Sequence, residues 1–227
     1  MRKDEREAMH RERLHAMLTF ERALWEGGAT NIAGVDEVGR GSLAGPVVAA
    51  CVVLPEDFSV TGINDSKKLS AKRREALCGT ICETALAYGV GAVDNQAIDR
   101  INILEATKLA MKAAINEAAA MLEGRGAGPI GHVLVDALTL DGIGLPQTAI
   151  IKGDEKSVTV AAASIVAKVW RDRLMDEYHK EYPQYAFDAN KGYGTRLHFE
   201  GISAAGLSPI HRKTFCAKAT KGPNALP

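Results

Sequence analysis

Three separate apolar stretches of the chain each lead to one or two carboxylates. Asp36 and Glu37 follow the run IAGV, Asp136 follows VLV, and Asp154 follows QTAIIKG. A carboxylate beside a buried run is costly unless it is paired or bound to a cation. Acids at the ends of several strands can converge on one edge of a sheet, and a set with only oxygen ligands favours Mg²⁺ or Mn²⁺ over zinc.

Four carboxylates suit two divalent ions about 4 Å apart, one activating a water for in-line attack on a phosphodiester and the other stabilising the leaving oxygen. Phosphoryl transfer is therefore the chemistry that we predict. Each acid also has a purely structural interpretation. Asp36 and Glu37 could be a solvated strand end, and Asp136 and Asp154 could each cap a helix.

Glu37 poses a geometric problem, because adjacent side chains on a strand point to opposite faces. Asp36 can enter a site directly, whereas Glu37 reaches the same ion only if the strand twists or ends there. The following Gly39 would permit such a change of direction.

Cationic and backbone donors near these acids could hold a nucleic-acid strand. The candidate cations are Arg40 in Gly39-Arg40-Gly41, Lys67 and Lys68 in NDSKKLS, and Lys168 and Arg171 further along the chain. The two glycines matter because a missing Cβ lets backbone N–H groups approach a phosphate or a ribose.

Other polar residues in this part of the chain are weaker candidates. Asp172, beside Arg171 and Arg173, is interpreted as a helix surface charge or an ion-pair partner rather than a fifth ligand. His198 and His211 do not have the spacing of metal ligands.

The elements that must position the acids follow from apolar periodicity, caps and glycine stops. The predicted elements are an amphipathic helix at 11–26, strands at 31–38 and 46–54, a helix at 71–88 capped by Ser70, a strand at 89–93, a long helix from about 101 to the loop at 124–131, strands at 132–135 and 147–152, and helices at 158–182 and 195–205. This order indicates a mixed sheet flanked by helices, an α/β layered domain. With 227 residues, 46% of them hydrophobic, one domain is expected.

Composition limits the possible partners and the compartment. The net charge is zero, but residues 152–227 hold 12 Lys or Arg against 8 Asp or Glu, which suits phosphate binding. The four cysteines lack the close spacing of a zinc site, so a reducing cytoplasm fits best. No signal-peptide pattern and no apolar run near 20 residues is present, so a soluble, unexported protein is expected.

Six segments together resemble bacterial ribonuclease HII in order and approximate spacing. They are VDEVGRGSLAGPVVAA, NDSKKLS, VDAL, KGDEKS, AAASIVAKVWRDRLM and KGYGT, and the resemblance spans about residues 32–211. It implies a ribonuclease H-like fold with helical N- and C-terminal additions. It divides the chain into an N-terminal helical extension (1–30), a type 2 ribonuclease H catalytic domain (31–214) and a C-terminal tail (215–227).

The resemblance also implies roles for individual residues. Asp36, Glu37, Asp136 and Asp154 match the family's metal ligands, with two Mn²⁺ or Mg²⁺ ions in the active complex. Gly39, Arg40, Gly41 and Tyr193 match the positions that recognise the junction between a ribonucleotide and DNA. An aromatic ring can stack on a sugar or base while its hydroxyl bonds the ribose 2′-OH. Lys67 is a further substrate-binding candidate, and Lys68, Lys168 and Arg171 are weaker ones.

The implied function is an endonuclease that hydrolyses the RNA strand of RNA/DNA hybrids. It would also cut duplex DNA 5′ to an embedded ribonucleotide, leaving 3′-hydroxyl and 5′-phosphate ends, as a cytoplasmic monomer. Two alternatives stay open at this point. One is a non-catalytic nucleic-acid-binding module on the same fold, and the other is a different hard-metal nuclease of the wider ribonuclease H-like group.

Overall fold

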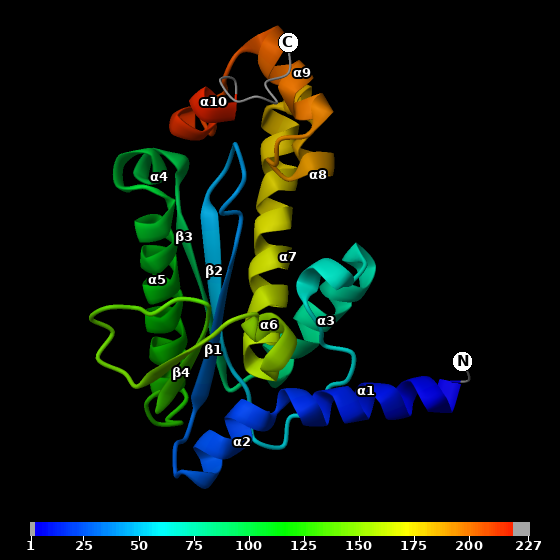
Figure 1. Ribbon diagram of the computed structural model, residues 1–227, viewed down its shortest axis with the longest axis vertical. Coiled ribbons are helices and arrows are strands. Elements are labelled where there is room, and N and C mark those ends of the chain that lie inside the picture. Colours follow the sequence, from blue (N-terminus) through cyan, green and yellow to red (C-terminus); the bar gives the residue numbers. More distant parts are fainter. Residues whose placement is uncertain (1–2, 220–227) are drawn as a thin grey trace.

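The computed structural model describes residues 3–219, and a five-stranded mixed sheet lies at its centre (Figure 1). The strands are β1 (Ile32–Val38), β2 (Val47–Val53), β3 (Ala87–Val93), β4 (His132–Asp136) and β5 (Gln147–Ile150). They lie in the order β3-β2-β1-β4-β5, with β2 antiparallel to both β3 and β1, and with β4 parallel to both β1 and β5. The predicted mixed sheet is confirmed.

Helices cover both faces of this sheet. The helices are α1 (Lys3–Met17), α2 (Thr19–Glu26), α3 (Ala71–Thr84), α4 (Asn95–Ile101), α5 (Ile103–Gly124), α6 (Gly153–Lys156), α7 (Val158–Glu181), α8 (Phe187–Asn190), α9 (Arg196–Ala205) and α10 (Lys213–Ala219), with 3-10 turns η1 (Ser66–Lys68) and η2 (Pro183–Tyr185). Helix α5 packs on β3 and β2, whereas α7 packs on β1 and β2 from the other side and carries α3 on its flank (Figure 1). The predicted α/β layers are therefore present.

The sequence of β2, VVAACVV, explains why two helical layers are needed. All seven of its residues are buried. Ala50 and Val52 belong to the core on the α7 side, and Ala49, Cys51 and Val53 belong to the core on the α5 side. A strand that is apolar on both faces has to be covered on both faces.

Glycines bring the helices unusually close to the sheet. A Cβ on Gly34 would lie 2.2 Å from the carbonyl carbon of Thr159 in α7, and one on Gly91 would lie 2.1 Å from the carbonyl oxygen of Ala110 in α5. Neither position has room for a side chain. As a result α7 lies directly against β1, the strand that leads to Asp36.

Several predicted boundaries differ from the structure, chiefly the helix expected at 71–88. Ser70 caps it as predicted, but α3 ends at Thr84. Ala87 and Tyr88 pair instead with Val53 and Val52 of β2. Residues 85–88 have reasonable helix propensity, but the ladder with β2 is a tertiary interaction that outweighs it.

Two predicted single helices are each divided. The helix expected at 11–26 is α1 followed by α2, and the break lets Met17 and Leu18 enter the core on the α7 side. The long helix is α4 followed by α5, separated by Asn102, whose φ is +71° and whose side chain caps α5. The strand expected at 147–152 ends at Ile150, because Lys152 has a left-handed backbone.

The C-terminal segment docks on α4. Asp99 accepts hydrogen bonds from the backbone N–H groups of Lys213 and Thr214 at 2.8 and 3.1 Å, and so caps α10. The expected tail at 215–227 thus begins inside α10, and its residues 220–227 lie outside the described residues. Within residues 3–219, no helix combines the length and the apolar composition that crossing a bilayer requires.

Helix α2 is joined to the start of α7 through Glu21. This side chain is fully buried, and its Oε1 accepts from Ser157 Oγ at 2.6 Å and from the backbone N–H of Thr159 at 3.1 Å. Ser157 is the N-cap of α7 and Thr159 lies in its first turn, so Glu21 of α2 supplies a hydrogen-bond acceptor to the N-terminus of this helix.

We therefore expect Glu21→Ala to destabilise the protein by about 2–3 kcal/mol, because two buried donors would lose their acceptor. For a chain of this size the corresponding fall in Tm is roughly 5–10 °C. Urea and thermal unfolding would measure it, with Glu26→Ala on the exposed end of α2 as the matched control. Equal stability of the two variants would contradict the coupling.

Candidate active site

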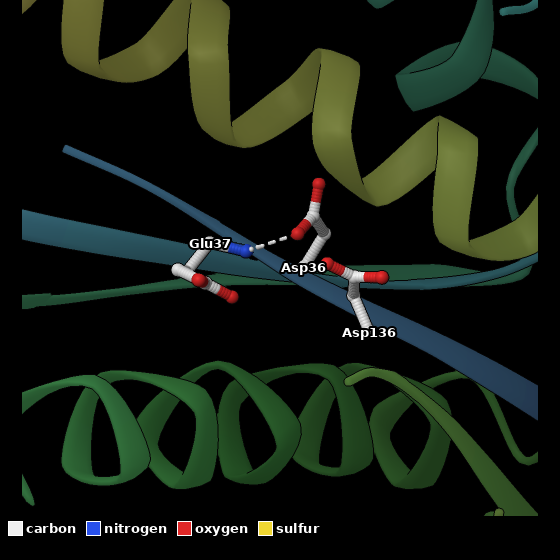
Figure 2. Close-up of side chains that lie close together, drawn as sticks. All are labelled: Asp36, Glu37 and Asp136. Carbon is white, nitrogen blue, oxygen red and sulfur yellow. Dashed lines mark hydrogen bonds between the residues drawn. The ribbon is translucent and has the colours of Figure 1, made fainter. Parts of the chain in front are cut away.

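Three acids meet at the carboxyl-terminal end of two neighbouring parallel strands. Val35 of β1 is the register partner of Val135 of β4, so Asp36 and Asp136 lie at the same level. One carboxylate oxygen from each of Asp36, Glu37 and Asp136 lies within 4.8 Å of the other two. Figure 2 shows the three side chains at this edge, with Asp36 directed toward α7. The predicted convergence is confirmed for these three acids.

Glu37 reaches the group because the neighbouring strand is shorter. Strand β4 ends at Asp136, whereas β1 continues to Val38, so Glu37 lies beyond the last residue of β4. Its side chain starts on the face opposite to that of Asp36. With β4 ended, its carboxylate can approach the edge that Asp36 and Asp136 share. The strand end that Glu37 requires is thus supplied by β4 rather than by β1.

The protein donates few hydrogen bonds to these carboxylates. Asp36 Oδ1 accepts from the backbone N–H of Glu37 at 2.7 Å (Figure 2), and Glu37 Oε1 accepts from Arg40 Nη1 at 3.2 Å. Asp136 Oδ1 accepts from the N–H of Gly153 at 2.7 Å, so this oxygen does cap a helix, the short α6. Glu37 Oε2 is buried and has no hydrogen-bond partner among the described residues. A buried carboxylate oxygen without a donor fits a bound cation.

The pKa values of the cluster indicate the same need for positive charge. Burial raises the pKa of Asp36 well above its usual range, and the charges of Glu37 and Asp136 raise it further. Burial also raises the pKa of Glu37, although Arg40 opposes the rise. Crowded, desolvated carboxylates disfavour the ionised form, which a divalent cation would favour.

Asp154 lies outside the three-acid group. It occupies the first turn of α6, and the N-cap of α7 is Ser157, whose Oγ accepts from the N–H of Val160 at 3.2 Å. The interpretation of Asp154 as the cap of the long helix is therefore wrong. Burial raises the pKa of Asp154, and the charges of Asp65 and Asp136 raise it further, so this acid lies within electrostatic reach of the group.

A cavity of about 430 Å³ opens beside the acids. Four segments distant in sequence line it, with Asp36, Glu37, Val38, Gly39, Arg40, Gly41, Ser66, Lys67, Ser164, Lys168 and Tyr193. The five main substrate-binding candidates thus lie around one pocket with two of the acids.

The buried side chain of Arg212 holds the turn at Gly39–Gly41, the corner of this pocket, in place. Its Nη2 donates to the carbonyl oxygen of Gly39 at 2.7 Å and its Nη1 to that of Arg40 at 2.8 Å. Within a peptide unit the N–H points opposite to the C=O. Because these two carbonyls point toward Arg212, the N–H groups of Arg40 and Gly41 point away from it. Both residues belong to the segment that lines the pocket.

The expectation that Arg171 holds substrate is wrong. Arg171 is fully buried, and its three nitrogens donate to the carbonyl oxygens of Ala44, Pro46 and Lys191 at 2.8–3.1 Å. A Cβ on Gly39 would lie 2.2 Å from Arg171 Nε. Gly39 therefore leaves room for a buried guanidinium.

The remaining lysine candidates differ in whether they line the pocket and whether they are paired with a carboxylate. Lys67 lines the pocket, whereas Lys68 does not and pairs with Glu155. Lys168 lines the pocket while its Nζ donates to Asp172 Oδ1 at 2.6 Å. Asp172 also accepts from Arg74 at 3.0 Å, so its interpretation as an ion-pair partner is confirmed.

Sequence reasoning missed two serines and one arginine. Ser66 Oγ and Ser164 Oγ lie 3.0 Å apart, and the side chain of Ser164 hydrogen-bonds Asp36, which opposes the rise in its pKa. The only sequence signal for Ser164 was a single hydroxyl in AAAS, a run interpreted as packing surface. Arg212 gave no local signal, because its acceptors lie more than 160 residues away.

A mixed sheet between helices, with three carboxylates gathered at the ends of β1 and β4 beside a cleft, suits a metal-dependent nuclease. The family model described as Ribonuclease HII matches residues 33–218. The chain belongs to the ribonuclease HII family, and so it is a ribonuclease H endonuclease.

Individual relatives agree with this family. A Ribonuclease HII of Caldanaerobacter subterraneus subsp. tengcongensis is 51% identical over 211 residues, covering 93% of this chain and 84% of the relative. The solved ribonuclease H2 of Pyrococcus horikoshii OT3 is 29% identical with a TM-score of 0.63, covering 81% of this chain and 92% of that one. Bst-RNase HIII, solved in complex with Mn²⁺, is 20% identical with a TM-score of 0.56. The match covers 86% of this chain and 71% of that one, and it shows a shared fold.

Proposed function

We propose that this ribonuclease H cuts duplex DNA 5′ to an embedded ribonucleotide as well as the RNA strand of RNA/DNA hybrids, leaving 3′-hydroxyl and 5′-phosphate ends. The observation that carries the proposal is the three-acid group beside a pocket that also holds the Gly39–Gly41 corner and Tyr193. A strand in that pocket would present a phosphodiester to the acids and the adjoining ribose to Tyr193. Such cutting would serve the excision of ribonucleotides from DNA.

Asp36, Glu37, Asp136 and Asp154 are the residues that we propose to hold two divalent ions, Mn²⁺ or Mg²⁺. The unpartnered Oε2 of Glu37 and the all-oxygen donor set support hard cations, and Bst-RNase HIII binds Mn²⁺. When bound, such ions activate a water and stabilise the leaving oxygen. Asp154 would join from the rim, because α6 sets it apart from the other three acids.

Substrate binding in the proposal divides between phosphate and sugar contacts. Lys67, Arg40 and the N–H groups of Arg40 and Gly41 would bind phosphate. The space beside Gly41 is open, because the nearest atom to a Cβ placed there would be Tyr193 Cε1 at 4.0 Å. The backbone of a nucleic-acid strand could therefore approach Gly41 closely. Tyr193 is 37% exposed, and the guanidinium carbon of Arg171 lies 5.7 Å from the centroid of its ring. An exposed ring whose hydroxyl can bond a 2′-OH suits a ribose.

We also propose that the enzyme acts as a monomer in the cytoplasm. The four cysteines are free thiols, as a reducing compartment favours. The family match gives no support to a non-catalytic binding module or to a different hard-metal nuclease.

The test is cleavage of one labelled duplex series: all-DNA, single-ribonucleotide, RNA/DNA hybrid and all-RNA, each with Mg²⁺ or Mn²⁺. We expect cutting of the hybrid and of the single-ribonucleotide duplex, the latter 5′ to the ribonucleotide, and no cutting of all-DNA. Tyr193→Ala should lower kcat/KM for the single-ribonucleotide duplex roughly 10- to 100-fold, as loss of one stacking contact does, and affect the hybrid less. Intact single-ribonucleotide duplex would refute the junction proposal, and equal losses on both substrates would refute the role of Tyr193.

A further inference from the structure

Two buried histidines lie directly behind Tyr193. His198 belongs to α9, and His211 lies just before α10 (both helices are labelled in Figure 1) and forms an isolated β-bridge with Ala44. Their Nε2 atoms are 3.0 Å apart. His198 Nδ1 lies 2.9 Å from the carbonyl oxygen of Tyr193. The pair thus connects the backbone of Tyr193 to the C-terminal segment.

The hydrogen-bond partners determine where each proton sits. The carbonyl of Tyr193 can only accept, so His198 Nδ1 donates to it, and Nε2 of the same neutral ring accepts. His211 Nε2 must therefore donate to His198. Consistently, His211 Nδ1 faces two groups of Ser208, the backbone N–H at 2.9 Å and Oγ at 2.7 Å, and accepts from them. Each ring nitrogen then has a partner when both rings are neutral: His198 Nδ1 and His211 Nε2 donate, and His198 Nε2 and His211 Nδ1 accept.

The surroundings keep the rings neutral. The ring of Tyr185 packs on His211 at 4.8 Å between centroids, and that of Phe187 packs on His198 at 5.2 Å. Burial lowers the pKa of both imidazoles, to about 4 for His211, where the neighbouring His198 contributes as well. Both rings are therefore uncharged near neutral pH, as the proton assignment requires.

We propose that His198 and His211 are positioning residues that set the place of the Tyr193 ring by fixing its carbonyl. Tyr193 depends on such support because it lies between Gly192 and Gly194 and its ring is part exposed. Its carbonyl oxygen accepts from His198 and also from the N–H of Thr195 at 2.8 Å. Two donors fix the orientation of that peptide unit and hence the direction of the side chain into the pocket.

The test rests on the proposed role of Tyr193 and uses a double-mutant cycle with the single-ribonucleotide duplex. His198→Phe keeps a ring but removes the donor, so we expect kcat/KM to fall about tenfold, roughly the effect of one lost hydrogen bond. If His198 acts through Tyr193, the same change in a Tyr193→Ala background should add almost nothing. His198→Asn, whose amide nitrogen can replace Nδ1 as donor to Tyr193, should restore most of the activity.

Tyr185→Phe is the matched control, because it removes a hydrogen bond to the carbonyl of Gly206 in the same aromatic cluster without touching the carbonyl of Tyr193. It should leave the preference between single-ribonucleotide duplex and hybrid unchanged. The hydrogen-bonded chain from His211 through His198 to the carbonyl of Tyr193, here called the relay, does not include the acids. The Mn²⁺ affinity of His198→Phe, measured by calorimetry, should therefore equal that of the unchanged protein.

Multiplicative losses in the double variant, or unchanged cleavage by His198→Phe, would overturn the inference. Imidazole ¹⁵N spectra provide a separate readout: the Nδ1–H form of His198 and the Nε2–H form of His211 support the relay, and any other pair of forms overturns it. If Tyr193→Ala alone cleaves both duplexes normally, the substrate role of Tyr193 fails, while the spectra still decide whether the relay exists.

Discussion

Asp36→Asn should lower the rate of phosphodiester cleavage at least about 1000-fold, because losing roughly 4 kcal/mol of transition-state stabilisation has that effect. Asp36 is the most buried acid of the group, and Glu37 and Asp136 both lie within 4.8 Å of it. An amide keeps the size of the side chain but removes the charge that would hold a cation. Single-turnover cleavage of the hybrid at saturating Mg²⁺ measures the loss.

The same substitution should make the metal-free protein more stable at neutral pH. The folded-state pKa of Asp36 is raised above its usual 3.8, so the native state binds more protons than the unfolded chain just above that pH. Stability therefore falls as pH rises through the raised pKa, and ionised Asp36 is unfavourable at neutral pH. Asparagine removes that cost, and Tm in EDTA should rise.

The control for this prediction is Asp141→Asn, the same chemical change on a side chain that is 85% exposed and does not line the pocket. It should leave cleavage and Tm unchanged. Substantial cleavage by Asp36→Asn, or a lower Tm in EDTA, would show that this carboxylate is not a ligand in a repulsive cluster.

Gly39→Ala should lower both stability and activity, whereas Gly41→Ala, only two positions along the chain, should lower activity alone. Gly39 has a φ of +89°, and a Cβ there would displace the guanidinium of Arg171 from its three carbonyl acceptors. The backbone strain alone costs roughly 1–2 kcal/mol, and unsatisfied buried groups add about 1–3 kcal/mol. We expect Tm to fall by roughly 5–15 °C, with loss of activity because the corner moves.

Gly41→Ala should fold normally, since the nearest atom to its Cβ would be Tyr193 Cε1 at 4.0 Å. The added methyl would project into the space that the substrate backbone needs. We expect kcat/KM to fall roughly 10- to 100-fold, the scale of a misplacement near 1 Å, with Tm unchanged. Thermal unfolding and cleavage of the single-ribonucleotide duplex measure both variants, and equal losses of Tm would contradict this division of roles.

Local sequence pattern was enough to predict the layers and the convergence of Asp36 and Asp136 at one edge of the sheet. The apolar runs before Asp36 and Asp136 are long enough to be strands, and parallel neighbours bring their ends together. Ser70 and the small-residue run that opens α7 likewise act on residues close to them in the chain. Periodicity and caps report such short-range interactions directly, which is why these elements were predictable.

The tertiary structure decided what local pattern leaves open. Whether Arg171 meets substrate or backbone depends on carbonyls of a loop that precedes it by about 125 residues. Whether Glu37 joins the group depends on where β4 stops, and the tautomers of His198 and His211 depend on partners brought together by folding. A side chain's own sequence neighbourhood does not encode its burial or its distant acceptors. The sequence by itself therefore determined which residue types were available for metal-dependent cleavage. Only the packing of α7 and the C-terminal segment around β1 decided which of them line the pocket and which hold the others in place.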